Sequence, residues 1–402
     1  MLFEIILAIF LGLIIGILTG LTPGIHINLV ASLLLASLSL PFISSISPLA
    51  LALFIVSLSI THTIIDFIPS IYLGAPNEET ILTIMPAHEL MKQGLGHTAF
   101  LISSLGSLSA IPIILISTPL MLEFLPYIFN STKTLMPYLL IFISFYLIFR
   151  EEKLLSGLIS FLLAGIIGFL TFNLPVEEPL LPLLSGLFGL SSLILSLNSP
   201  IDKQKQIIQK ITEIDLPKKD LIKSFISALI ITPFFSFLPG LSSTHAATIS
   251  SEFFNLEKRA FLFLTGAINM TIMSLSFVTA YSIGKSRSGS AATILDLLNT
   301  IQLKELIIIL LVIILVSIIT FIIGIHISKF FSKLINIINY KILTILVISL
   351  IILVNILLSN TLGLLVLLTS TALGIFTIQS NSRRINLMGA LIIPVIIYYL
   401  MN

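Results

Sequence analysis

The sequence contains no cysteine, which excludes disulfide bonds, thiolate metal sites and catalysis by a thiol. Charged residues are also scarce: Asp, Glu, Lys and Arg make up 9% of the 402 residues, whereas an ordinary soluble domain carries about 25%. This scarcity excludes a soluble globular protein. The formal net charge of +2 is too small, and the charges are too scattered, to indicate a nucleic-acid partner.

Long apolar runs are abundant instead, and hydrophobic residues make up 57% of the chain. A helix that crosses a bilayer core needs about 20 predominantly apolar residues. Runs of that length recur along the chain, for example at 306–326 and 342–359. The pattern predicts an all-α polytopic membrane protein, which crosses the lipid bilayer of the cell membrane several times.

The apolar pattern occurs twice. Each half opens with an apolar segment, a Pro-Gly break and a second apolar segment, and the breaks are Thr22-Pro23-Gly24 and Pro239-Gly240. A long segment and a polar loop follow each break, and further apolar runs complete each half. We therefore predict a first membrane repeat at 1–198, a charged cytoplasmic linker at 199–219 and a second membrane repeat at 220–402.

The distribution of basic residues indicates that the repeats have inverted topology. If each Pro-Gly break makes a re-entrant hairpin, each repeat has about five spanning helices, and this odd number inverts the second repeat. With the linker inside, most of the 20 Lys and Arg residues face the cytoplasm, as the positive-inside rule requires. Inverted repeats with broken helices are typical of secondary transporters. The alternative is that Pro-Gly only separates two fully spanning helices.

Polar residues follow both breaks, at the start of the next helix. Such a start presents backbone N–H groups without intrahelical partners and the positive end of the helix dipole, so it attracts anions. The candidate substrate-binding residues are Pro23, Gly24, His26, Asn28, Pro239, Gly240, Ser242, Ser243, Thr244 and His245. Two such starts that face each other would bind a carboxylate or phosphate. N-capping alone is the alternative, since it favours the same residue types.

An acidic residue lies within the apolar run at 49–73. Asp66 follows His62 by four residues, which places both on one helical face. A carboxylate inside a membrane is costly unless it is paired or solvated, so it indicates an ion path or a coupling site. Asn269 lies in the corresponding region of the second half. We predict that these three residues bind the coupling cation, Na⁺ or H⁺, and a structural His62–Asp66 pair is the alternative; no other cofactor or metal is expected.

Two basic residues, Lys285 and Arg287, lie in a Gly/Ser-rich loop after the long segment of the second half. Under the predicted topology they lie outside, against the positive-inside rule. A basic pair beside loop N–H groups suits the capture of an anionic substrate, and an ordinary solvated loop is the alternative. The sequence has no phosphate-binding loop, GxSxG motif or HExxH motif, so an enzyme is not expected.

The motif Gly12-x3-Gly16-x3-Gly20-Leu21-Thr22-Pro23-Gly24, with Pro239-Gly240 in the other half, resembles the large permease subunit of the tripartite tricarboxylate transporters. Thr61-His62-Thr63, Asp66-Phe67-Ile68-Pro69-Ser70 and Leu73-Gly74-Ala75-Pro76 resemble the shorter archaeal members of that family. The resemblance implies a permease with inverted repeats that takes up citrate or a similar carboxylate with an ion gradient. It also implies two partners, a small membrane subunit and an extracytoplasmic binding protein.

The paired Pro-Gly breaks also look similar to a membrane family that returns polyprenyl phosphate lipid carriers across the membrane. We expect a secondary active permease for a small organic anion such as a di- or tricarboxylate, coupled to Na⁺ or H⁺ by alternating access. The alternatives are a translocase for a polyprenyl phosphate, and a structural or assembly membrane protein without a transported substrate. The structural alternative predicts packed, dry surroundings at both breaks, whereas transport predicts a polar cavity there.

Overall fold

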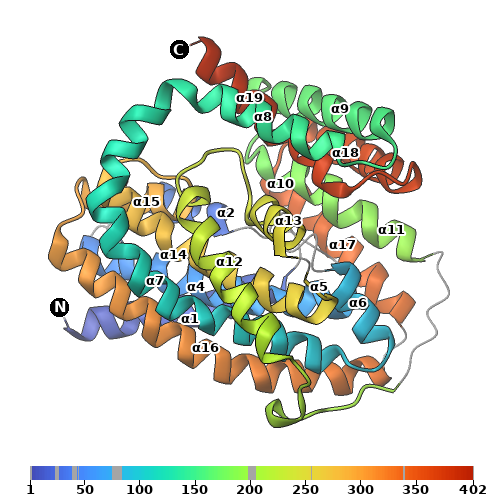
Figure 1. Cartoon of the computed structure of the whole chain (residues 1–402), viewed down its shortest axis with the longest axis horizontal. Helices are drawn as coiled ribbons and strands as arrows, with labels where there is room; N and C mark the ends of the chain where they lie inside the picture. Colours follow the sequence, from blue (N-terminus) through green and yellow to red (C-terminus); the bar gives the residue numbers. More distant parts are fainter. Residues whose placement is uncertain are drawn as a thin grey trace.

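The computed structural model describes every residue except 1, 23–26, 39–42, 44, 75–83, 198–204, 255, 338–339 and 402. Within this part of the chain the regular structure is helical, and nine helices are long and apolar enough to cross a membrane. Figure 1 shows that they cross one another at many angles. The predicted all-α polytopic membrane protein is therefore confirmed.

The helices of the first half are, in chain order, α1 (Leu2–Leu21), α2 (Ile27–Ser37), α4 (Pro48–Ile65), α5 (Phe67–Leu73), α6 (Ile84–Lys92), α7 (Gly96–Thr132), α8 (Met136–Phe149), α9 (Leu154–Asn173), α10 (Leu180–Leu184) and α11 (Ser191–Leu197). A π-helical turn at Ser185–Leu190 joins the last two. The helices of the second half are α12 (Lys218–Phe235), α13 (Ser243–Phe254), α14 (Lys258–Ile283), α15 (Gly289–Leu298), α16 (Leu303–Ile337), α17 (Tyr340–Leu358), α18 (Thr361–Gln379), the 3-10 turn η4 (Arg384–Met388) and α19 (Gly389–Met401).

The two halves have the same order of elements. In each half, an opening helix and a short helix are followed by a 26-residue span, which is α4 with α5 in the first half and α14 in the second. Another short helix and a very long one come next, and the long helices have 37 residues in α7 and 35 in α16. This order supports the predicted repeats, while their boundaries and their inverted orientation stay predictions.

Helices α1 and α4 pack closely because glycines lie between them. A Cβ on Gly12 would lie 2.6 Å from the Phe54 carbonyl oxygen, and a Cβ on Gly16 would lie 2.6 Å from Thr61 Cβ. Helices in lipid associate through such close contacts of small residues, since apolar side chains gain little by leaving lipid tails. The glycine motif at 12–20 thus fixes α1 against α4.

The most extensive helix contact joins α7 of the first half to α14 of the second. A Cβ on Gly106 would lie 2.0 Å from the Phe263 carbonyl oxygen, and a Cβ on Gly266 would lie 1.9 Å from the Ser103 carbonyl oxygen. The two glycines therefore let the backbones touch where the helices cross. Helix α14 is buried along nearly its whole length, so this crossing is a central contact between the halves.

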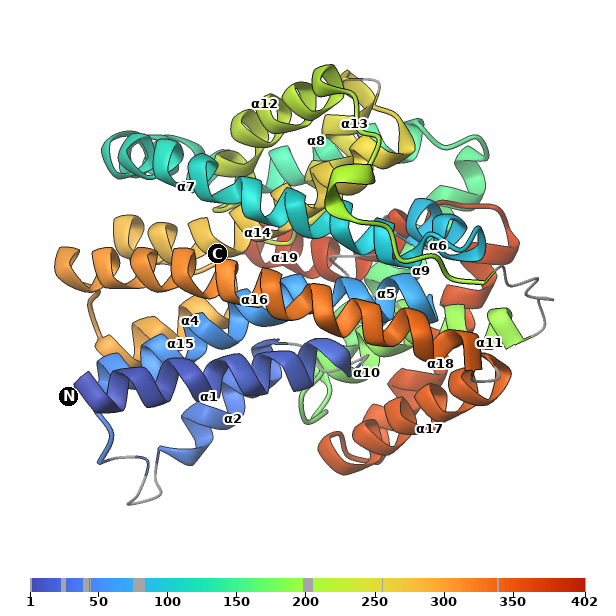
Figure 2. The same cartoon turned by 90° about the horizontal axis from the view of Figure 1, so that it is seen from below.

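The longest helices, α7 and α16, exceed the thickness of a membrane. At about 1.5 Å per residue they are about 55 and 52 Å long, whereas the hydrocarbon core is about 30 Å thick. Pro112, Pro119 and Pro126 lie inside α7 and remove backbone hydrogen bonds, which bends a helix. Figure 1 shows α7 curving along its length, and Figure 2 shows it beside α16.

The described part of the linker is anchored to the helices. Gln206 is buried, its side-chain amide donates to the Met91 carbonyl oxygen at 2.7 Å, and its Oε1 accepts from the Gly96 N–H at 3.0 Å. The Gln206 backbone N–H donates to Asn336 Oδ1 at 3.0 Å. The linker therefore joins the start of α7 to the end of α16.

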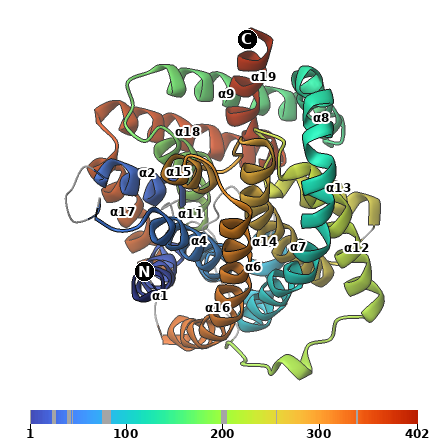
Figure 3. The ribbon, with the colours of Figure 1, turned by 90° about the vertical axis from the view of Figure 1, so that its left-hand side faces the viewer.

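The last helix, α19, packs on α9 of the first half. Figure 3 shows this pair at the edge of the molecule, away from α1. A Cβ on Gly168 would lie 1.9 Å from the Ala390 carbonyl oxygen, and a Cβ on Gly389 would lie 2.3 Å from the Phe161 carbonyl oxygen. Close packing at glycines thus fixes the C-terminal helix against the first half.

Gly106→Ala should destabilise the protein, because the new methyl group would lie 2.0 Å from a backbone carbonyl oxygen. Overpacking of this kind costs about 1–3 kcal/mol. Gly189→Ala is the matched control, since the nearest atom to its new methyl group would lie 3.7 Å away. Thermal unfolding in detergent, followed by loss of the monodisperse gel-filtration peak, measures the effect. An unchanged unfolding temperature for Gly106→Ala would contradict the close crossing of α7 and α14.

Candidate functional site

The second break lies between α12 and α13, at Pro239-Gly240. Gly240 has a φ of +76°, in the left-handed region that favours glycine, so the chain turns sharply here. Helix α13 then begins at Ser243, which is buried. The His245 N–H donates to the Ser242 carbonyl oxygen at 3.1 Å, and the first turn presents the positive end of the helix dipole.

Ser242 and His245 hydrogen bond to each other at the start of α13. The Ser242 backbone N–H donates to His245 Nδ1 at 3.1 Å, and the Ser242 hydroxyl lies 3.0 Å from the same nitrogen. Since a backbone N–H can only donate, Nδ1 is the unprotonated nitrogen, and Nε2 carries the hydrogen of the neutral ring. Among the described residues, His245 Nε2 and the Ser243 hydroxyl are buried without a hydrogen-bond partner. Buried polar atoms normally have one, so the start of α13 has unused capacity for a ligand or water.

Arg287 reaches back to the break from the loop after α14. Its Nε donates to the Leu241 carbonyl oxygen at 3.2 Å, and its Nη2 donates to the same oxygen. The guanidinium therefore lies close to the start of α13, where the helix dipole is also positive. Two positive potentials at one place attract an anion.

The starts of α2 and α15 meet nearby. The Gly289 N–H donates to Asn28 Oδ1 at 3.0 Å, which joins a residue that follows the first break to the second half. Ser288 caps α15 by accepting from the Ala291 N–H at 3.2 Å, and its hydroxyl lies 2.9 Å from that of Ser276. A Cβ on Gly289 would lie 2.6 Å from Asn28 Oδ1, so a side chain at this position would displace that of Asn28.

A cavity of about 480 Å³ lies beside these three helix starts. Its polar side comes from the segments around α2, α13 and α15: Asn28, Pro239, Gly240, Leu241, Ser242, Arg287 and Ser288. Its other walls come from α9, α10, α14, η4 and α19: Phe172, Leu180, Leu184, Met273, Met388, Leu391, Pro394, Val395, Tyr398 and Tyr399. The cavity is therefore two-sided, because hydrogen-bonding groups and a guanidinium face an aliphatic and aromatic wall.

Several predicted binding residues come together at this cavity. Those that line it are Asn28, Pro239, Gly240, Ser242 and Arg287. Ser243, Thr244 and His245 follow on α13 and are buried. Pro23, Gly24 and His26 lie outside the described residues. The binding roles of all these residues stay predictions.

Lys285 lies apart from Arg287. Its Nζ lies 5.2 Å from the centre of the Phe129 ring, near the end of α7, which is a cation–π contact. Lys285 is exposed and is not among the residues that line the cavity. The two members of the predicted basic pair therefore have different surroundings, and Arg287 is the one at the break.

Asp66 lies where the long span is interrupted. Helix α4 ends at Ile65, and Asp66 forms the turn before α5. Pro69 has no N–H, so the Ile65 carbonyl lacks its usual helical donor. The Asp66 carboxylate belongs to a residue that is buried in the protein. A carboxylate and a carbonyl released by proline are oxygen ligands of the kind that a hard cation prefers.

The other predicted coupling residues lie on α4, which contacts α15, and on α14, which lines the cavity. His62 Nδ1 lies 3.1 Å from the Thr19 hydroxyl of α1. One turn earlier on α4, the Ser59 hydroxyl donates to Ser290 Oγ of α15 at 2.9 Å. Asn269 is buried on α14, one turn before Met273 of the cavity wall. The cation-coupling role of these residues is still a prediction.

Sequence reasoning missed the cavity wall formed by η4 and α19. Met388, Leu391 and Val395 belong to an apolar run, in which a residue that faces a cavity cannot be distinguished from one that faces lipid. The pair Tyr398 and Tyr399 is the available signal, since a tyrosine ring suits a place where apolar and wet surroundings meet.

Comparison with known proteins gives a family-level result. The sequence profile of the tripartite tricarboxylate transporter TctA family matches residues 6–389. The chain is also similar to an uncharacterized protein of Methanocaldococcus jannaschii, with 32% identity over 410 residues that cover 98% of this chain and 99% of the relative. No solved structure matches the chain. The resemblance seen in the sequence motifs is therefore confirmed.

A single introduced thiol reports whether water fills the cavity, because the sequence lacks cysteine. Val395 lines the cavity, whereas Ile392 on the same helix is 1% exposed. A small charged methanethiosulfonate should label Val395→Cys about tenfold faster than Ile392→Cys, because reaction requires an accessible thiolate. Mass spectrometry of protein in nanodiscs measures both rates. Equal rates would contradict a water-filled cavity and would favour a structural protein.

Proposed function

Because the chain belongs to the tripartite tricarboxylate transporter TctA family, we propose that it is the membrane permease of a secondary transporter for a small organic anion, such as a di- or tricarboxylate. The observation that carries this proposal is the cavity at the second break, where Arg287 and the start of α13 converge. A cavity with a polar side suits a transported anion and argues against a purely structural protein. Transport of this kind needs no covalent chemistry, so we propose no enzymatic activity.

The anionic group of the substrate binds at the polar side of the cavity. It accepts from the Arg287 guanidinium, which here donates to the Leu241 carbonyl oxygen. The Ser288 hydroxyl, which lines the cavity at the start of α15, supplies a further donor. The carbon skeleton then lies against the apolar wall, and a second carboxylate reaches toward Asn28.

The coupling ion, Na⁺ or H⁺, binds at Asp66. The carboxylate and the Ile65 carbonyl oxygen offer ligands to Na⁺, while Asp66 and His62 offer two sites to a proton. From Ser59 to Asp66 the distance along α4 is about 10 Å. The Ser59–Ser290 hydrogen bond therefore connects the helix of the cation site to α15 beside the anion site. Asn269 would take part from the corresponding helix of the second half.

Alternating access follows when one repeat moves against the other. We place the two inverted repeats in the cell membrane and the linker on its cytoplasmic side. The TctA family works within a tripartite system, so we propose a small membrane subunit and an extracytoplasmic binding protein as partners. The binding protein would deliver the substrate from outside.

A polyprenyl phosphate is a second candidate substrate, and the apolar wall favours it. Phe172, Leu184 and Val395 offer a surface to a hydrocarbon chain, whereas a small tricarboxylate gains little from such a wall. The phosphate would bind at Arg287 and the chain would lie along α19. The two candidates share one anion site, so a binding experiment with both ligands separates them.

Arg287→Gln should weaken anion binding, whereas Lys285→Gln should leave it unchanged. Loss of a charged hydrogen-bonding group costs about 1.5–3 kcal/mol, which raises Kd roughly 10- to 100-fold. Thermal shifts of both variants with citrate, succinate, phosphate and a short-chain polyprenyl phosphate provide the measurement, since ligands that bind the native state stabilise it. A shift with a carboxylate supports the first candidate, and a shift with the lipid phosphate alone supports the second. Full binding by Arg287→Gln would place the site elsewhere.

Asp66→Asn should uncouple transport from the cation. An amide cannot exchange the proton and binds Na⁺ more weakly than a carboxylate, so uptake into proteoliposomes driven by a Na⁺ or pH gradient should fall about tenfold or more. Substrate exchange without a gradient should continue. Glu123→Gln, at an exposed acid on α7, is the control. Normal gradient-driven uptake by Asp66→Asn would rule out the coupling role.

A further inference from the structure

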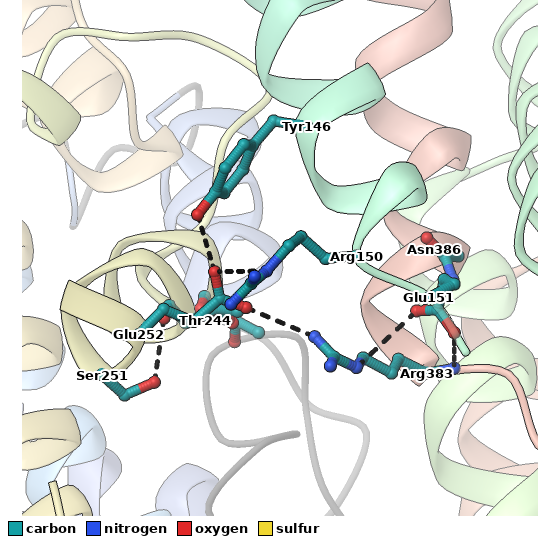
Figure 4. Close-up of polar contacts among 9 residues, drawn as sticks. Tyr146, Arg150, Glu151, Thr244, Ser251, Glu252, Arg383 and Asn386 are labelled. Carbon is teal, nitrogen blue, oxygen red and sulfur yellow. Dashed lines mark hydrogen bonds and ion pairs between the residues drawn. The ribbon is translucent and has the colours of Figure 1, made fainter. Parts of the chain in front are cut away.

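An ion-pair network lies at the opposite end of α13 from the cavity. Glu252, in the last turn of α13, accepts a hydrogen bond from the Tyr146 hydroxyl at 2.7 Å. Its carboxylate also pairs with Arg150 at 3.3 Å and with Arg383 at 3.5 Å. Figure 4 shows Glu252 between these two arginines, which come from the end of α8 and from the segment before η4. Both halves of the chain therefore meet at one carboxylate.

A second carboxylate, that of Glu151, holds Arg383 from the other side. Its Oε1 accepts from Asn386 Nδ2 at 2.9 Å, and its Oε2 accepts from the Arg383 backbone N–H at 3.2 Å. The Glu151 side chain is 2% exposed, whereas those of Arg150 and Arg383 are 54% and 45% exposed. The Glu151 carboxylate is thus buried and held by hydrogen bonds. The side chains of the two arginines are partly exposed to solvent where they reach Glu252.

Three elements connect this network to the cavity. Helix α13 begins at the cavity and carries Glu252 in its last turn. Helix α9 begins just after Glu151 and carries Phe172 of the cavity wall near its end. The segment from η4 through α19 carries Asn386 at one end and Tyr398 of the cavity wall at the other. At about 1.5 Å per residue, the distance between the network and the cavity is about 14 Å along α13, about 30 Å along α9 and about 18 Å along the segment from η4 through α19.

We propose that Glu252, Arg150 and Arg383 form a gate, which closes the end of the transport path opposite the cavity. This proposal rests on the transport function proposed above. The predicted topology puts the gate on the cytoplasmic side, because Arg150 and Arg383 are among the basic residues that the positive-inside rule places there. The protein is then closed inside by the gate, while the cavity faces the outside.

The charges of the gate suit repeated opening and closing. Ion pairs of partly exposed arginines are weak, since water and salt compete for both partners. Glu151 keeps its hydrogen bonds to Asn386 and to the Arg383 backbone while Glu252 leaves, so it guides the Arg383 side chain back to the same place. Release of Glu252 frees one end of α13, and the other end contacts Arg287 through Leu241. An anion that draws Arg287 away from Leu241 therefore acts on the helix that the gate holds.

Thiol labelling of Thr248→Cys tests the gate without knowledge of the substrate. Thr248 is buried on α13, one turn before Glu252, and the chain has no other cysteine. A membrane-impermeant methanethiosulfonate should label it about tenfold faster when Glu252→Gln is added, because access to the thiol limits the reaction. The increase should occur only with reagent on the cytoplasmic side, which inside-out and right-side-out vesicles distinguish.

Two further variants test whether the increase in labelling is specific to the gate. Arg150→Gln should raise the labelling rate less than Glu252→Gln, since the Arg383 pair remains. Glu89→Gln is the matched control, because it breaks an ion pair with Lys258 that lies outside the gate, and it should leave the rate unchanged. Unchanged labelling in both Glu252→Gln and Arg150→Gln would overturn the gate.

A reversible cross-link separates failure of the gate from failure of the proposed function. Tyr146→Cys and Glu252→Cys, joined by a bis-methanethiosulfonate, hold the gate closed. Uptake should fall about tenfold and return on reduction of the link, while anion binding at the cavity stays within about twofold. Full uptake by the cross-linked protein would overturn the gate. Faster labelling of Thr248→Cys in a protein that carries no carboxylate or lipid phosphate would support the gate and overturn the proposed function.

Discussion

Backbone N–H and C=O groups inside a bilayer need partners from protein or water, because lipid offers none. The break at Pro239-Gly240 leaves such groups without helical partners, and side chains around the break supply hydrogen bonds in their place. Arg287 donates to the Leu241 carbonyl oxygen, and Ser242 bonds with His245. Pro239, Gly240, Leu241 and Ser242 of the break line a cavity. The groups that accommodate a broken helix are thus the same groups that suit an anion, which is why the anion site lies at the break.

The helices of this structure are held together in two ways, by close packing at glycines and by ion pairs. In the α7–α14 and α1–α4 pairs, a backbone carbonyl oxygen of one helix lies against a glycine of the other. Charged side chains hold the end of α13 instead, through Glu252 and its half-exposed arginine partners. A helix with an anion site at its start and weak ion pairs at its end can move without disturbing the glycine contacts. Selective movement of this kind is what alternating access requires.

The sequence predicts much of the fold and part of the site. Apolar runs and Pro-Gly breaks place most of the helices, because length and hydropathy in a membrane leave few alternatives. The run at 306–326 falls short of the end of α16 (Leu303–Ile337), because charged residues in its last turns interrupt the apolar pattern. Ser242 follows from helix-end chemistry, and Arg287 follows from a basic pair in a Gly/Ser-rich loop on the predicted outer side. Lys285 and Arg287 have different surroundings, and Val395 belongs to an apolar wall. Both features depend on tertiary contacts, which the spacing of residues in the sequence does not reveal. Glu252 is missed because an acid near a helix end resembles an ordinary surface charge until its partners, far away in the sequence, are placed.

Counterflow in proteoliposomes is the most direct test of the central claim that the cavity carries an anion across the membrane. Vesicles loaded with unlabelled succinate or citrate, and diluted into a trace of the labelled compound, need no knowledge of the coupling ion. We expect transient accumulation of label that saturates with concentration, that is absent from protein-free vesicles and that Arg287→Gln reduces. Absence of counterflow for every carboxylate and for a short-chain polyprenyl phosphate, in protein that remains folded, would contradict the claim.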